Sequence, residues 1–144
     1  MVVREMYFAV LGDNVDSKNL SNRNEVMTHL RHVLNTVNYE YEEYIASNFN
    51  LTVRDEFHEL LSNASKLFEI LDFVWYSLYP IKLRSGIGIG DMSTSFRRET
   101  SNRSDGPAYW AARQAINTTD IKNSLICIEA DLIDLLPSLK KWDS

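Results

Sequence analysis

The chain has 144 residues, of which 44% are hydrophobic and 24% are charged, and its net charge at pH 7 is −5. This length suits one packed domain rather than two, and the acidic balance argues against the basic surface with which proteins coat nucleic acid. The sequence shows no signal-peptide pattern and no apolar run long enough to cross a membrane. Because Cys127 is the single cysteine, a disulfide framework is excluded, and we expect a cytoplasmic protein.

The first strand is predicted at residues 6–11, a run of apolar and mostly strand-favouring residues that ends at Gly12-Asp13. After a polar loop, Ser21 is suited to cap a helix. The apolar residues of this helix recur at helical spacing, at Val26, Leu30, Val33, Leu34 and Val37.

A hairpin is predicted next. Residues 49–53 alternate between apolar and polar, residues 56–61 form a second strand, and only Arg54-Asp55 lies between the two. The following helix stops before Pro80, because proline disfavours helical geometry in the residue that precedes it. Its apolar stripe consists of Leu67, Ile70, Leu71, Val74 and Leu78.

Residues 81–90 predict another strand, in which glycine occupies every second position at the end (Gly86, Gly88 and Gly90). One face of this strand lacks side chains, which permits close approach of a backbone, a helix or a ligand. We expect a short strand at 92–96, a helix that opens at 105–107, a strand at 125–128 and an amphipathic helix at 131–141. This order predicts an α+β, ferredoxin-like fold: a mixed or antiparallel sheet with helices packed mainly on one face.

Two carboxylates are predicted to meet at one edge of this sheet. Asp13 ends the first strand, and Asp55 lies at the hairpin, beside Glu56. A magnesium-phosphate site requires a pair of acids held side by side. Each acid also has a structural interpretation, because aspartate readily caps a loop and acids on a turn are often surface charges.

Four motifs, in order along nearly the whole chain, resemble the SatD family of bacterial proteins. They are Gly12-Asp13, Asp55-Glu56-Phe57, LRSGIGIG at 83–90 and DGPAYWAAR at 105–113. The resemblance implies a single SatD-type domain over residues 1–144. Family members are often longer and carry a helix-turn-helix segment beyond this domain, which implies either the N-terminal part of a longer protein or a shorter member.

The same motifs resemble, more distantly, class III nucleotide cyclases and GGDEF diguanylate cyclases. In those enzymes an acid that ends the first strand and an acid at the hairpin hold two divalent ions on a nucleoside triphosphate. The resemblance therefore implies Mg²⁺ or Mn²⁺ at Asp13, Asp55 and Glu56, with Arg113 and Tyr109 at the catalytic positions of the later helix. The residues that it implies around the nucleotide are Gly12, Asp16, Ser17, Lys18, Arg54, Gly88, Gly90, Asp105 and Gly106.

Two positions depart from the cyclase pattern. Arg54 stands where cyclases have glycine, and it brings a side chain and a positive charge into the space where the backbone would approach phosphate. Tyr109 stands where an asparagine would supply an amide to the transition state. Arg113 also has a structural interpretation, as an ion-pair partner of Asp105 or Glu99.

These observations predict a regulatory or ligand-binding domain with a degenerate, non-catalytic cyclase-like site. The alternative is a metal-dependent nucleotidyl- or phosphoryl-transfer enzyme in which Asp13 and Asp55 hold Mg²⁺. We expect a homodimer with a nucleotide as its ligand, because cyclase-like sites form between protomers. We expect no membrane association and no direct nucleic-acid binding by this domain.

Overall fold

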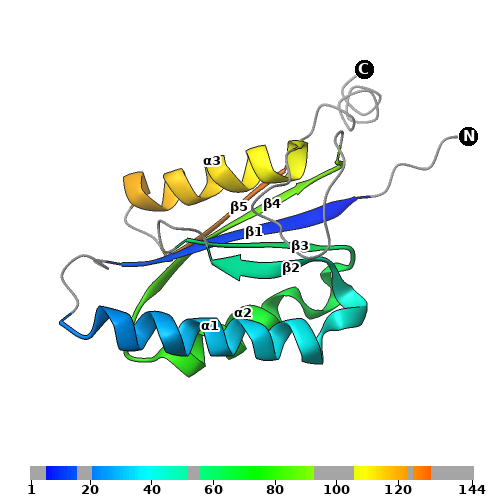
Figure 1. Ribbon diagram of the computed structural model, residues 1–144. Helices are drawn as coiled ribbons and strands as arrows, with labels where there is room; N and C mark the ends of the chain where they lie inside the picture. The colour runs from blue at the N-terminus through cyan, green and yellow to red at the C-terminus, as the bar shows by residue number, and fades with distance from the viewer. Residues whose placement is uncertain (1–5, 16–20, 52–55, 93–105, 123–124, 131–144) are drawn as a thin grey trace, which may run out of the picture.

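The computed structural model describes residues 6–15, 21–51, 56–92, 106–122 and 125–130. Within these residues, five strands and three α-helices follow one another along the chain (Figure 1). In order they are β1 (Tyr7–Asn14), α1 (Arg23–Glu40), β2 (Ile45–Leu51), β3 (Phe57–Leu61), α2 (Leu67–Leu78), β4 (Leu83–Gly90), α3 (Pro107–Lys122) and β5 (Ile126–Ala130). Short 3₁₀ turns, η2 (Glu42–Tyr44) and η3 (Ala64–Lys66), precede β2 and α2.

The strands form one sheet in the order β2-β3-β1-β4-β5. The pairs β2–β3, β3–β1 and β1–β4 are antiparallel, whereas β5 pairs in parallel with β4. The first six elements, β1-α1-β2-β3-α2-β4, make the ferredoxin-like unit, and α3 and β5 extend it at the β4 edge. The predicted α+β fold with a mixed sheet is confirmed.

The face of the sheet below the strands in Figure 1 is covered by α1 and α2. Both helices turn their predicted apolar stripes inward, and each of the ten residues of these stripes is buried. They pack with strand residues such as Val10, Phe57 and Ile87 into the larger core cluster. At the start of this helical region, the Asn63 side chain accepts a hydrogen bond from the Ser65 amide, which caps η3.

Among the helices of the described residues, α3 is the one that covers the opposite face, and here the helix lies very close to the sheet (Figure 1). A Cβ atom at Gly88 would overlap the carbonyl oxygen of Ala108 and the amide nitrogen of Ala112, and one at Gly86 would overlap the backbone at Ile116. The side-chain-free face predicted for this strand is therefore filled by a helix backbone. Of the three described helices, α1 and α2 share one face of the sheet. Gly86 and Gly88 allow α3 to pack closely on the opposite face.

The largest differences from the predicted strand boundaries are in β1 and β2, whereas β4 and β5 differ from the prediction by one or two residues. The first strand continues through Gly12 and Asp13 to Asn14, so the acid lies within the sheet rather than beyond its end. The second strand begins at Ile45, before the predicted start at Phe49. Its early part is irregular, because the register with β3 shifts twice and the Asn38 side chain bonds both the amide and the carbonyl of Phe49.

Several predicted segments lie outside the described residues. They are the Arg54-Asp55 turn, the strand at 92–96 beyond Met92, the Asp105 cap and the amphipathic helix at 131–141.

Candidate functional site

The register of the central strands brings acids and bases together on the α3 face. Gly12 pairs with Phe57 across β1 and β3, so one further step along the same register brings Asp13 opposite Glu56. On its other side, Asp13 pairs directly with Arg84 of β4. Because side chains alternate between faces, these three groups share the face that carries Ala9 and Leu11 beneath α3.

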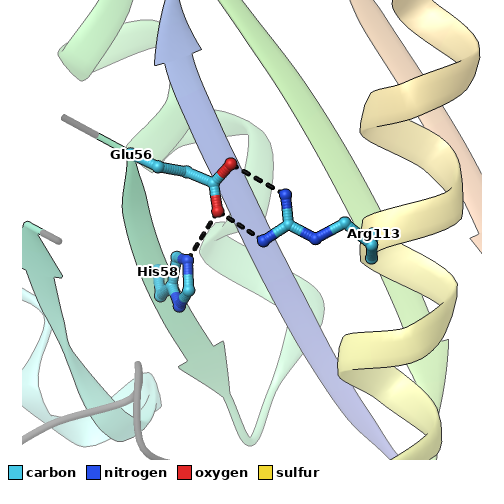
Figure 2. A network of polar contacts seen from close by, with 3 residues as sticks. All are labelled: Glu56, His58 and Arg113. Atoms are coloured by element: carbon cyan, nitrogen blue, oxygen red, sulfur yellow. Dashed lines mark hydrogen bonds and ion pairs between the residues drawn. The ribbon is translucent and has the colours of Figure 1, made fainter. Parts of the chain in front are cut away.

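Glu56 is held by two positively polarised partners (Figure 2). Its Oε2 accepts a hydrogen bond from Arg113 Nη1 at 2.8 Å, and its Oε1 accepts one from Arg113 Nη2 at 2.5 Å. His58 Nε2 lies 2.7 Å from the same Oε1. Burial alone would raise the pKa of Glu56, but the hydrogen bonds from His58 and Arg113 outweigh it and lower the pKa to about 2.

The pair is a two-point clamp between the start of β3 and the middle of α3. Each of the two terminal guanidinium nitrogens donates to a different carboxylate oxygen, and this bidentate geometry is among the strongest available to such a pair. The hydrogen bonds to Glu56 also raise the pKa of Arg113. Glu56 is therefore an anion, and Arg113 a cation, throughout the physiological range.

A second ion-pair chain joins β1, β4 and the last turn of α3. Arg84 Nε lies 3.3 Å from Asp13 Oδ1, and Arg84 Nη1 contacts Asp120 Oδ1. The Asp13 contact lacks hydrogen-bond alignment, and Oδ1 is buried. Burial raises the pKa of Asp13, and the nearby charge of Glu56 adds to this, while Arg84 and Arg113 oppose it. Asp13 is thus the less well compensated of the two acids.

The glycine and alanine packing of α3 places its polar residues over this cluster. Tyr109, Arg113 and Asp120 are spaced four and seven residues apart, which puts them along one side of the helix. Tyr109 is buried, and its ring centroid lies 6.3 Å from that of His58. Gly106 precedes α3 with φ at +151°, a conformation that favours glycine, and its carbonyl accepts the Trp110 amide.

The structure thus brings Asp13, Glu56, Tyr109 and Arg113 of the predicted set into one cluster. Gly90 ends β4 opposite Tyr7. The space beside Gly12 is filled by the ring of Phe57, and that above Gly88 by α3, so both residues have structural reasons to be glycine. The predicted site residues outside the described part of the chain are Asp16, Ser17, Lys18, Arg54, Asp55 and Asp105.

Sequence reasoning did not assign Arg84 or Asp120 to the site. Arg84 precedes Gly86 and Gly88 at the same two-residue spacing, which places it on the α3 face, and this signal was available. Asp120 lies seven residues beyond Arg113, hence on the same side of the helix. The partner of Arg113 is Glu56, and this contact joins residues 57 positions apart, which no local pattern encodes.

The cyclase resemblance implies divalent ions at this cluster of acids. Carboxylates are the donors that Mg²⁺ prefers, and Asp13 and Glu56 supply them. Among the described residues, however, no group of three or more His, Cys, Asp or Glu side chains is arranged to hold a metal. Arg113 occupies both oxygens of Glu56, and Arg84 lies against Asp13. In this arrangement, the described residues do not fit a divalent ion.

Solved structures with the same fold are nucleotide cyclases and their relatives. A bacterial light-regulated adenylyl cyclase superposes with a TM-score of 0.63 at 8% identity, over 88% of this chain and 77% of that one. The diguanylate cyclase SiaD of Pseudomonas aeruginosa, solved with its activator SiaC, gives 0.60 at 12% identity, over 88% of this chain and 50% of that one. An EAL/GGDEF domain protein from M. capsulatus gives 0.59 at 14% identity, over 88% and 86%. The fold is therefore that of a nucleotide-cyclase-like domain.

The SatD family model matches residues 7–132. The chain belongs to the SatD family, as its motifs predicted. No curated protein matches the sequence. Within the described residues, none of the helices combines the length and the apolar character that a membrane crossing needs.

Proposed function

We propose that this chain is a regulatory, ligand-binding domain whose cyclase-like site is not catalytic. The observation that carries the proposal is the clamp between Glu56 and Arg113. In the enzymatic interpretation these two residues act separately, the acid on metal and the arginine on developing negative charge. In this structure the carboxylate of Glu56 accepts its hydrogen bonds from the guanidinium of Arg113, so the two residues bind each other rather than a ligand.

The charges of the site support the same proposal. Two arginines, Arg84 and Arg113, face three acids, Asp13, Glu56 and Asp120. A cation that enters must displace an arginine from a carboxylate, and an anion must draw an arginine away from one. An exchange at Glu56 or at Asp120 alters a contact that joins α3 to the sheet, so ligand binding at either acid is coupled to the position of α3. Such coupling suits a domain that signals occupancy.

The second candidate is the metal-dependent nucleotidyl- or phosphoryl-transfer enzyme. One observation favours it: burial and the charge of Glu56 raise the pKa of Asp13, so its charged form would gain from an added cation. In this alternative Asp13 and Asp55 are the residues that would hold Mg²⁺, and the ion would polarise a phosphoryl group.

Thermal unfolding with ligands separates these functions. The chain is heated with Mg²⁺ or Mn²⁺, alone and with each nucleoside triphosphate, as wild type, as Asp13→Asn and as Asp72→Asn. Asp72 is an exposed acid of α2 far along the chain from the site, and its variant is the matched control. A ligand at a hundredfold its Kd adds about 2.7 kcal/mol to the free energy of unfolding. We expect a shift in wild type and Asp72→Asn that Asp13→Asn reduces.

Turnover is measured on the same samples by product analysis. The proposal expects a ligand-induced shift without product. Product that depends on Mg²⁺ and is lost in Asp13→Asn would establish the enzyme instead. No shift with any ligand would leave the acids as residues that shape the sheet edge, and partner binding would become the leading account.

The homodimer remains part of the proposal. It is supported by the analogy with sites that form between protomers, and light scattering over a concentration series tests it. A mass that stays at 16.7 kDa, that of one chain, at every concentration, with and without ligand, would remove it.

A further inference from the structure

Two grooves lie side by side at the end of the helical layer where α1 begins and α2 ends (Figure 1). The first, between α2 and the start of β4, has a volume of about 440 Å³ and an apolar, aromatic lining. The second, between α1 and α2, has a volume of about 420 Å³. Residues 79–81 line both grooves, so they form the wall between them.

The wall and its flank expose two aromatic rings. Tyr79 is 82% exposed, and Tyr76, which lines the first groove, is 84% exposed. Covering both rings would remove roughly 250–400 Å² of surface from water. A specific interface buries roughly 800 Å² on each partner, so these two side chains supply a large part of it. An exposed apolar patch of this extent marks an interaction site.

We propose that a second copy of this chain docks on this surface, about a two-fold axis that runs along the wall at Tyr79. Such an axis turns the first groove of one protomer toward the second groove of its partner. The Tyr79 rings of the two protomers then meet at the axis, and Tyr76 enters the partner's second groove. Clefts of roughly 300–1,000 Å³ hold a drug-sized ligand, so each groove has room for one aromatic ring.

Charge favours a second copy over an unrelated partner. Lys82 lines the first groove and Glu25 lines the second, and both residues are exposed. Because the wall lies between them, the two-fold axis brings Lys82 of one protomer toward the partner's Glu25, and the reciprocal contact forms on the other side. A patch with opposite charges on the two sides of an apolar centre is therefore complementary to itself.

This surface is separate from the acid cluster. Leu83, Trp75 and Ile81 of the grooves belong to the core on the α1 and α2 face, whereas Glu56 and Arg113 lie on the α3 face. His29 Nε2 donates a hydrogen bond of 2.8 Å to the Ser77 carbonyl, which holds the two sides of the second groove together. The association therefore does not rest on the proposed ligand binding, and it forms without ligand.

Charge reversal and mixing test the interface in the intact chain, by sedimentation velocity without ligand. Lys82→Glu and Glu25→Lys each bring like charges together, so each variant alone should associate at least about tenfold more weakly than wild type. An equimolar mixture of the two variants restores both attractive contacts and should associate like wild type. The control is Asp72→Lys, which reverses an exposed acid of α2 outside both grooves and should leave association unchanged.

The aromatic centre is tested separately. Tyr76→Gln should weaken association at least about tenfold, whereas Tyr39→Gln, which removes an 80% exposed ring near the C-terminal end of α1, should not. Four results would overturn the proposal. Wild type could stay monomeric at every concentration, which would leave the surface to another partner. The single reversals could associate like wild type, or their mixture could remain as weak as its components. Association that Asp13→Asn abolishes and Tyr76→Gln spares would place the interface at the acid cluster instead.

Discussion

The two faces of the sheet are built by opposite means. On the α1 and α2 face, large side chains such as Leu30, Leu61 and Ile70 interdigitate, and distance between the layers is set by their volume. On the α3 face, glycine in β4 meets alanine in α3, and the two backbones nearly touch. The first face tolerates repacking, whereas at Gly86 and Gly88 the second face presents backbone atoms, which cannot move aside as a side chain can.

The polar site lies on the face with the closer packing. A helix held at backbone contact has little freedom to rotate or slide, so the guanidinium of Arg113 is delivered to Glu56 at 2.5 and 2.8 Å. A helix resting on flexible leucines would hold this distance less tightly. On one face, large buried side chains stabilise the fold. On the other face, close contact between backbones fixes the position of α3 and therefore of Arg113.

Adding one methyl group to the α3 face is expected to have the largest effect. Gly88→Ala places a Cβ into the backbone of Ala108 and Ala112, which cannot yield without moving α3. We expect a loss of about 3 kcal/mol or more in the free energy of unfolding. The control is Ile87→Val on the adjacent residue, which points to the other face and should cost about 0.5–1.5 kcal/mol. Denaturant unfolding gives both free energies. Equal losses of stability in the two variants would contradict the proposed difference in packing between the faces.

The site should dominate the response of stability to acid. The pKa of Glu56 is lowered to about 2, so its contribution is complete above its ordinary value near 4.5 and is lost as the pH falls toward 2. We expect up to about 3 kcal/mol over this window. The raised pKa of Asp13 acts in the opposite direction, so the comparison is made in an Asp13→Asn background. Further substitution of Glu56→Gln should flatten the stability profile between pH 4.5 and 2, and an unchanged profile would refute the assignment.

A double-mutant cycle measures the clamp itself. Glu56→Gln, Arg113→Met and the double variant are unfolded at pH 7. Because the Arg113 side chain is about half exposed, solvent screens the pair, and we expect a coupling free energy of about 1–2 kcal/mol. Additive losses would show that the two side chains are neighbours without being partners.

A smaller effect is expected from a polar bridge between α1 and β2. Asn38→Ala removes two hydrogen bonds to Phe49, one accepted from its amide at 2.7 Å and one donated to its carbonyl at 3.1 Å. The site is partly buried, so water can replace some of the loss, and we expect about 1 kcal/mol. Thr36→Ala nearby, which removes a bond within α1 only, is the control. Amide exchange at Phe49 should rise in the first variant alone.

The smallest expected effect has the opposite sign. Burial and Glu56 raise the pKa of Asp13, so its negative charge is unfavourable at neutral pH. Asp13→Asn should leave stability at pH 7 unchanged or slightly raised, since Arg84 keeps Asp120 as a partner. A clear loss of stability would mean that the contact between Asp13 and Arg84 outweighs the burial of the charge.

Most of the fold follows from local patterns in the sequence. The helical stripes of α1 and α2 and the alternation of glycine in β4 report directly on which face each residue turns to the core. The start of β2 was missed because this strand is irregular, and Asn38 supplies bonds to Phe49 from outside the ladder. A tertiary contact of that kind leaves no period in the sequence.

The sequence predicted some members of this cluster but none of its pairings. Asp13, Glu56 and Arg113 follow from motifs, whereas the choice of Glu56 for Arg113 depends on where α3 crosses the sheet. That crossing is fixed by Gly86 and Gly88 against α3, a contact between distant segments. Arg84 was overlooked because a strand arginine beside glycines resembles an ordinary solvent-facing residue.

The ring of Phe57 occupies the space that a side chain at Gly12 would need. Phe57 directly follows Glu56 in the chain, so the position of the Glu56 carboxylate depends on Gly12, a residue without a side chain. An alanine at position 12 would push the ring aside and carry Glu56 away from Arg113. Under the proposed function, such a chain would lose its response to ligand although no ligand contact had been removed, and Gly12 would be mistaken for a binding residue.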